Sequence, residues 1–142
     1  MDKALKSKSN RSNETNILPL SGVGRIPPQA IELEEAVLGA LLIDRDALSK
    51  VIDILSSESF YVDGHQKIFE AITQLFGDSD PIDILTVSQR LKKEGELNNI
   101  GGEAKLIGLS TRVSSSAHIE FHARIVVQKH IQRELIRISH NM

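Results

Sequence analysis

The chain has 142 residues, of which 40% are hydrophobic and 25% are charged, and a chain of this size forms one domain that buries roughly two-thirds of its unfolded surface. It contains no cysteine, which excludes disulfides, thiolate metal sites and a cysteine nucleophile. Residues 27–111 carry fifteen acids against seven Lys or Arg, whereas residues 1–26 and 112–142 each carry two acids against five, and an acidic body argues against a dedicated DNA-binding domain.

Residues 1–24 are rich in Ser, Asn and Lys and show no hydrophobic period. Such a segment buries too little apolar surface to offset its ordering entropy, so we expect a disordered tail. The opening MDKALKSKSN lacks the apolar region of a secretory signal, and no apolar run in the chain approaches the ~18–20 residues of a membrane span. We therefore expect a soluble, cytoplasmic protein with no membrane partner.

Helical periodicity dominates the following stretch. AIELEEAVLGALLI comes just after a proline pair and repeats apolar residues at helical spacing, which predicts a first helix. DRDALSKVIDIL predicts a second helix, with Asp44 or Asp46 as its N-cap. HQKIFEAITQLF carries an apolar stripe that includes Phe76, and it predicts a third helix that Gly77 ends.

The next segment, ILTVSQRLKKE, has a β-branched start that leaves a strand open as an alternative. Asp83 is a candidate N-cap, and the spacing of Val87 and Leu91 suits a helix that ends at Gly95. We therefore favour a helix for this segment.

The stretch LNNIGGEAKLIGLST invites comparison with a phosphate-binding loop, because a glycine pair is followed by a lysine. A nucleotide-triphosphate loop needs a wider glycine spacing and a Lys followed by Ser or Thr, whereas Lys105 is followed by Leu106. The dinucleotide fingerprint GxGxxG does not occur either. We therefore expect Gly101 and Gly102 to turn the chain before a short helix, and we expect no cofactor in this chain.

The last segment, SSSAHIEFHARIVVQKHIQRELIRISHNM, predicts a long helix with Ser115 or Ser116 as a candidate cap. Most of its apolar residues spread over roughly half the circumference, wider than the ~100° stripe that one core requires, and Ile119 and Val126 lie on the other side. We therefore expect contact with both the body and a partner, although a helix sunk into a groove of the body is the simpler alternative. Nothing around Met142 resembles a helix stop, which predicts a longer chain.

Few side chains suggest chemistry. His118 and His122 have a spacing that can present two imidazoles to one zinc ion, but no third ligand accompanies them in a known pattern, so we predict no metal site. His65 is interpreted as a helix-start residue that bonds backbone groups. Capping and the helix dipole explain the acids near turns and helix starts, which are Asp44, Asp46, Asp78, Asp80 and Asp83. With no catalytic constellation, we expect no enzymatic activity of this chain alone.

Five sequence blocks occur in a specific order: RIPPQAIELEEAVLGALLID, ESFYVDGHQKIFEAI, PIDILTVSQRL, LNNIGGEAKLIGL and SAHIEFHARIV. Together they resemble the N-terminal domain of the bacterial replicative DNA helicase DnaB, from about Arg25 to Met142. Two positions depart from the family pattern: Lys105 stands where an aromatic residue is frequent, and Ser114 stands where a proline is common. Both departures concern local contacts near the last helix.

The resemblance implies an all-α fold, with a compact helical body of about six helices in residues 25–112. The first helix of a helical hairpin would follow in residues 113–142. In such helicases the N-terminal domains pair through their hairpins and assemble as a trimer of dimers, a collar on a ring of ATP-hydrolysing motor domains. This collar recruits the C-terminal domain of primase and so couples unwinding to primer synthesis.

The same resemblance implies partners and contact residues. A helicase loader is a further candidate partner, and ATP, Mg²⁺ and most contacts with single-stranded DNA would belong to a motor domain absent from this chain. The residues that we select for primase contact are Lys105, Arg133, Ile136 and Arg137. The residues that we select for oligomerisation are Phe121, Ile125, Ile131, Leu135 and Ile138.

Pairing of this chain alone should be marginal. About four large apolar side chains would supply ~6–12 kcal/mol gross, against association costs of ~4–15 kcal/mol, so we predict a monomer or a weak dimer. Two other classes remain open. LTVSQRLKKEGELNNIGGEAKLIGL is compatible with a small helix-turn-helix-like DNA-binding domain, although the acidic body disfavours it, and a self-contained enzyme is disfavoured by the lack of paired catalytic groups.

Overall fold

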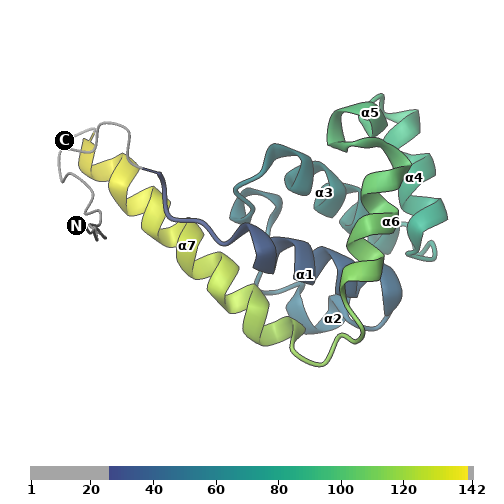
Figure 1. The fold of residues 1–142 in the computed structure, drawn as a ribbon, viewed down its shortest axis with the longest axis horizontal. Helices are drawn as coiled ribbons and strands as arrows, with labels where there is room; N and C mark the ends of the chain where they lie inside the picture. Colours follow the sequence, from purple (N-terminus) through teal and green to yellow (C-terminus); the bar gives the residue numbers. More distant parts are fainter. Residues whose placement is uncertain (1–25, 141–142) are drawn as a thin grey trace, which may run out of the picture.

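The computed structural model of the chain describes residues 26–140, and every regular element among them is helical (Figure 1). This confirms the predicted all-α fold. The predicted tail, residues 1–24, and Met142 lie outside the described residues. The described elements, in chain order, are α1 (Ile31–Ile43), α2 (Leu48–Val51), the 3-10 turn η1 (Ser57–Ser59), α3 (Asp63–Gly77), α4 (Ile84–Lys93), α5 (Leu97–Ile100), α6 (Gly102–Arg112) and α7 (Ile119–His140).

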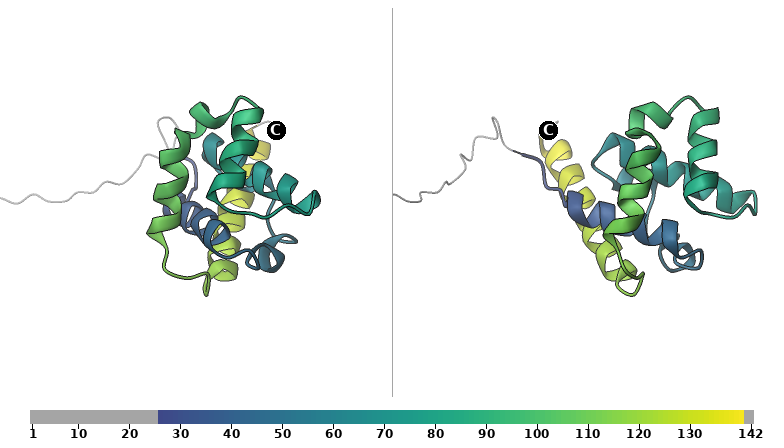
Figure 2. Two further views of the ribbon diagram at one scale, coloured as in Figure 1. Left: turned by 90° about the vertical axis from the view of Figure 1, so that its right-hand side faces the viewer. Right: turned by 45° about the vertical axis from the view of Figure 1, so that its right-hand side comes forward.

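Helix α1 lies at the centre of the fold and packs against α6, α7 and α3 (Figures 1 and 2). Its residues 37–42 are all buried, because neighbouring helices cover it on more than one side. The contact with α6 requires a glycine. A Cβ atom on Gly39 would lie 2.2 Å from the backbone oxygen of Leu109, so only a residue without a side chain allows the two helices to approach this closely.

Helix α3 supplies the largest aromatic contact of the core. Phe69 is buried, and its ring centroid lies 5.2 Å from that of Phe60. The apolar stripe is shorter than predicted, because Phe76 in the last turn is 47% exposed. Gly77 is the last helical residue, but the chain reverses two residues later, at Ser79, whose φ of 61° is left-handed. The predicted end of the helix at Gly77 is therefore confirmed, and the chain reversal follows it at Ser79.

The predicted N-caps have different outcomes. Asp83 caps α4, since its carboxylate accepts from the Thr86 N–H at 2.9 Å, and this confirms a helix rather than a strand. Asp44 does not cap α2, which is a single turn without a side-chain cap. Asp44 instead accepts from the Ser116 hydroxyl at 2.5 Å and from the Asp46 N–H at 2.9 Å. These bonds, chiefly that from Ser116, hold the pKa of Asp44 below its ordinary value.

The glycine pair turns the chain as predicted. Gly101 and Gly102 have φ angles of 110° and 76°, a region that residues with a side chain rarely adopt. They separate α6 from the one-turn helix α5, which the sequence pattern did not predict because a segment of four residues is too short to show a period. The prediction of a short helix after the glycines is confirmed by α6.

Among the described residues, the fully buried side chains of α7 all lie in its first half. Ile119, Ala123 and Val126 are buried, and the helix contacts α1, α2 and η1. These residues include the two that the helical wheel separates from the broad apolar set. The second half projects past the body (Figures 1 and 2). None of the described helices, α7 included, combines the length and hydrophobicity needed to cross a membrane.

Candidate interaction surface

The projecting helix exposes a stripe of large apolar side chains. Phe121, Ile131, Leu135 and Ile138 are between 48% and 64% exposed. At 100° per residue these four positions fall within about 100° of the helical wheel. We call them the apolar stripe of α7, and all four belong to the residues that the sequence selected for oligomerisation.

Two further isoleucines lie on a different line of α7. Ile125 is half-buried and Ile136 is 38% exposed. They are eleven residues apart, a separation of about three turns, so they lie one above the other. Ile136 is rotated by about 100° from its neighbour Leu135. Ile125 is also one turn from Phe121 and about 40° from it on the wheel, so it borders both the apolar stripe and the line of Ile136, the residue selected for primase contact.

A groove joins the apolar stripe to the body. It holds a cavity of about 240 Å³, lined by the apolar residues Ile54, Val127 and Ile131. The polar side chains of Arg124, Gln128 and Gln132 also line it. The stripe therefore continues from the free end of α7 onto the segment that follows α2, and sequence periodicity could not show this because the lining comes from two distant segments.

Arg133 is held by the chain itself. Its guanidinium donates to the Pro28 carbonyl at 2.8 Å and to the Ser59 carbonyl at 3.1 Å. It also lies over the Tyr61 ring, 5.3 Å from the centroid. These contacts place Arg133 on the side of α7 that faces the body. Its guanidinium is therefore bonded to the backbone of two separate segments.

Arg137 lies one turn further along and is exposed. Its guanidinium donates to the Glu134 carboxylate at 2.7 Å. This hydrogen bond lowers the pKa of Glu134 and raises the pKa of Arg137. The two groups form a solvent-facing pair, which water and salt screen strongly.

Lys105, the fourth residue selected for primase contact, lies on α6 and not near these residues of α7. Its ammonium is 3.0 Å from one Glu35 oxygen, and the Arg112 guanidinium is 2.7 Å from the other. Burial would raise the pKa of Glu35, but the hydrogen bond and charge of Lys105, with the charges of Arg112 and His65, hold it below its ordinary value. Helix α7 packs on α1, α2 and η1, so the fold does not bring Lys105 together with the selected residues of α7.

His65 lies in the first turn of α3, as interpreted, but among the described residues its side chain bonds a carboxylate and not the backbone groups that were expected. The side chain is 2% exposed, and its Nδ1 lies 2.7 Å from the Glu34 carboxylate. Glu34 is also buried and accepts from the Tyr61 N–H at 2.6 Å. The sequence did contain a signal: Glu34 stands four and seven residues before Leu38 and Leu41, at an otherwise apolar position of the buried face.

No described cluster resembles a metal or catalytic centre. The ring centroids of His118 and His122 lie 6.2 Å apart. Within residues 26–140 the structure contains no group of three or more His, Cys, Asp or Glu that could hold a metal ion. The two histidines lie instead along a cavity of about 290 Å³ beside the loop that joins α6 to α7.

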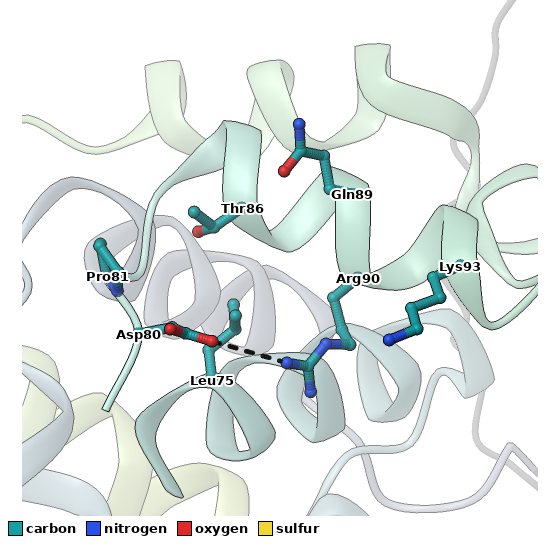
Figure 3. A pocket seen from close by; sticks show the side chains of 7 residues that line it. All are labelled: Leu75, Asp80, Pro81, Thr86, Gln89, Arg90 and Lys93. Atoms are coloured by element: carbon teal, nitrogen blue, oxygen red, sulfur yellow. Dashed lines mark ion pairs between the residues drawn. The ribbon is translucent and has the colours of Figure 1, made fainter. Parts of the chain in front are cut away.

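A separate polar cavity of about 330 Å³ lies between α3 and α4 (Figure 3). Its residues are Leu75, Asp80, Pro81, Thr86, Gln89, Arg90 and Lys93. The Arg90 guanidinium lies 2.9 Å from Asp78 and 3.8 Å from Asp80, and it donates to Gln74 at 3.2 Å. The Arg90 guanidinium is therefore already surrounded by acceptors. The cavity lies where the two helices meet, and its lining shows no nucleophile placed beside a base.

The candidate helix-turn-helix segment folds as α4, α5 and α6, with α6 in the place of a recognition helix. The two basic residues of α6, Lys105 and Arg112, both face Glu35. The hydroxyls of Ser110 and Thr111 donate to backbone carbonyls of α6 itself, at 2.8 and 3.1 Å. The helix therefore presents few free donors to a DNA groove.

Comparison with known proteins gives one consistent result. Residues 26–128 match the family described as the DnaB-like helicase N terminal domain. The replicative DNA helicase DnaB of Rhodothermus marinus is 48% identical over 110 residues, which are 78% of this chain and 12% of that protein. The replicative DNA helicase DnaB of Geobacillus stearothermophilus is 44% identical over 115 residues, which are 81% of this chain and 25% of that protein. The chain thus spans a quarter or less of these relatives.

The fold agrees with a solved structure of the same kind. The crystal structure of the N-terminal domain of DnaB helicase from Mycobacterium tuberculosis matches with a TM-score of 0.80 and 34% sequence identity, covering 82% of this chain and 81% of that one. Sequence and fold thus point to the same relatives. This chain belongs to the DnaB-like helicase N-terminal domain family.

Proposed function

We propose that the chain is the N-terminal collar domain of a replicative DNA helicase, which pairs with further copies through α7 and recruits primase. The parent protein would be an ATP-driven DNA-unwinding motor whose nucleotide, Mg²⁺ and most DNA contacts lie outside this chain. One observation carries the proposal. In a chain of this family, the half of α7 that projects from the body exposes three large apolar side chains at adjacent turns, those of Ile131, Leu135 and Ile138.

An apolar line of this kind needs a partner. Single exposed apolar residues are common on monomers, but a contiguous line beside a groove is typical of an interaction site. Burial of the four side chains of the apolar stripe is worth about 6–12 kcal/mol gross, against association costs of about 4–15 kcal/mol. The chain alone is therefore expected to be a monomer or a weak dimer, and a stable ring is expected only in the longer parent.

Two arcs of α7 support two contacts at once. The apolar stripe occupies one arc, whereas Ile136 and the neighbouring Arg137 occupy another. Residues on different arcs can contact different partners without competing for the same atoms. We assign the stripe to pairing and the Ile136 arc to the C-terminal domain of primase.

Sedimentation velocity over a range of concentrations tests the pairing. Leu135→Asp should weaken self-association about tenfold or more, because each factor of ten corresponds to ~1.4 kcal/mol and burying a charge in an apolar contact exceeds this. The matched control is Leu85→Asp on α4, since Leu85 is 60% and Leu135 is 61% exposed. Unchanged association in Leu135→Asp, or a tight hexamer of the chain alone, would contradict the proposal.

Calorimetric titration with the isolated C-terminal domain of primase tests the second assignment. Ile136→Asp should weaken this binding while leaving self-association unchanged, and Leu135→Asp should show the reverse pattern. Ile107→Asp, at a 48% exposed isoleucine of α6, is the control for adding an acid to the surface. Full primase binding by Ile136→Asp would remove the assignment to this arc.

A further inference from the structure

The second half of α7 is joined to the body by few contacts. The last fully buried residue of the helix is Val126. Among the side-chain hydrogen bonds described for residues 26–140, those that run from residues 130–140 to another element all come from Arg133. Apolar packing therefore fixes the first half of the helix, and Arg133 is the next point of attachment.

The geometry of Arg133 defines a direction as well as an attachment. Its two bonds reach carbonyls of different segments, Pro28 before α1 and Ser59 in η1. The third contact places the guanidinium over the Tyr61 ring. A planar guanidinium with fixed N–H directions can satisfy all three contacts in one orientation, whereas a lysine ammonium on a flexible stem cannot.

The segments that receive Arg133 are themselves fixed to the body. The Tyr61 N–H donates to the buried Glu34 at 2.6 Å, and Glu34 is bonded to His65 of α3. The Phe60 carbonyl accepts from Gln66 at 2.7 Å. These bonds attach residues 59–61, which Arg133 contacts, to both α1 and α3. Arg133 is therefore bonded to a fixed part of the body and not to a free loop.

We propose that Arg133 is a positioning residue that sets the direction of α7 relative to the body. The three contacts of Arg133 fix this direction. The consequence for pairing, that Arg133 directs the apolar stripe toward a second copy, rests on the proposed function. Arg133 then positions α7 within its own chain, and the residues of α7 proposed for primase contact are Ile136 and Arg137.

The length of the lever makes the role measurable. Ser139 lies thirteen residues beyond Val126, which is about 20 Å along a helix at 1.5 Å per residue. A swing of about 15° would move this end by about 5 Å. Since the chain has no cysteine, spin labels can be attached specifically through Asn98→Cys on α5 and Ser139→Cys on α7, which replace exposed residues.

Double electron–electron resonance between the two labels tests the inference. The otherwise unchanged chain, diluted with unlabelled chain to remove contacts between copies, should give one narrow distance distribution. Arg133→Gln should shift or broaden it by about 5 Å, and Arg133→Lys should restore it only in part. Arg137→Gln, which removes a guanidinium one turn away, should leave it unchanged.

The outcomes separate this inference from the proposed function. An identical distribution in folded Arg133→Gln and in the parent chain would overturn the inference, whatever happens to pairing. A changed distribution with unaltered self-association would support the role of Arg133 in setting the direction of α7 and contradict its consequence for pairing, whereas Leu135→Asp tests pairing itself. If Arg133→Gln does not fold by circular dichroism, Tyr61→Leu removes the stacked ring and keeps the carbonyls. It should then give a smaller shift in the same direction, and an unchanged distribution would again overturn the inference.

Discussion

Phe69 and Phe121 both lie on long helices of this chain, and the fold treats them in opposite ways. Phe69 on α3 is 2% exposed and lies against Phe60, whereas Phe121 on α7 is 64% exposed. Both are phenylalanines at apolar positions of a helical pattern, so the local sequence does not distinguish them. Their difference teaches that the body satisfies its apolar residues internally, while the projecting helix carries apolar residues that the described part of the chain leaves uncovered.

The carboxylates show the same division. Glu34 in the body is 1% exposed and accepts from a backbone N–H and from His65. Glu134 on α7 is 42% exposed and faces Arg137 of the same helix. In the body a charged or polar group joins elements that are distant in sequence. On the second half of α7, Arg133 alone does so among residues 26–140.

Truncation of the two phenylalanines gives the largest expected contrast. Phe69→Ala should lower the free energy of unfolding by about 3–5 kcal/mol, because it removes a buried ring and leaves a cavity beside Phe60. Phe121→Ala should change it by no more than about 0.5 kcal/mol, because an exposed ring loses little burial. Urea denaturation of both variants, at a concentration where the chain is monomeric, measures the difference. Equal losses would mean that α7 is covered by its own chain.

Two helical glycines give a smaller contrast within the body itself. Gly39→Ala should destabilise the fold by about 1–3 kcal/mol or more, because its Cβ would meet a backbone atom of α6 that cannot move away without shifting the helix. Gly108→Ala should stabilise it by up to about 1 kcal/mol, because the space around Gly108 is open and alanine favours a helix.

The measurement is thermal and urea unfolding of both glycine variants. A Gly39→Ala chain as stable as the parent would show that α1 and α6 are less closely packed than the structure describes. A destabilised Gly108→Ala chain would show that the outer face of α6 is covered. Either result would change which faces of α1 and α6 are regarded as packed and which as exposed to solvent.

Local rules predicted much of the fold because they depend on residues close in sequence. Asp83 and Thr86 are three residues apart, and the cap they form follows from residue type and spacing alone. The glycine pair was predictable for the same reason. The failures came from contacts that are distant in sequence: Asp44 has the residue type of a cap, but its carboxylate accepts from the hydroxyl of Ser116, 72 residues away.

The interaction surface was predictable only in outline. An apolar face wider than one core requires indicated a partner for the last helix, and the resemblance to a family selected residues on it. Neither could show that Arg133 faces the body, since its acceptors are backbone carbonyls 74 and 105 residues away. Nor could they show that Lys105 and Arg112 share Glu35. Such contacts depend on tertiary structure, for which sequence spacing contains no signal.

The smallest expected effect compares the two ion pairs at acidic pH. The folded state lowers the pKa of Glu35 below its ordinary 4.5, so the stability that this carboxylate contributes is present above pH 4.5 and is lost as the pH falls through the lowered pKa. Glu35→Gln should therefore lower stability at pH 7, by no more than about 1 kcal/mol, and this loss should shrink as the pH falls below 4.5. Glu134→Gln has the same sign, but its fully solvated pair should produce a smaller change that added salt removes. Urea unfolding between pH 3 and pH 7 measures both, and an equal or larger effect of Glu134→Gln would show that the pair of Glu134 and Arg137 within α7 is less screened by water than its exposure indicates.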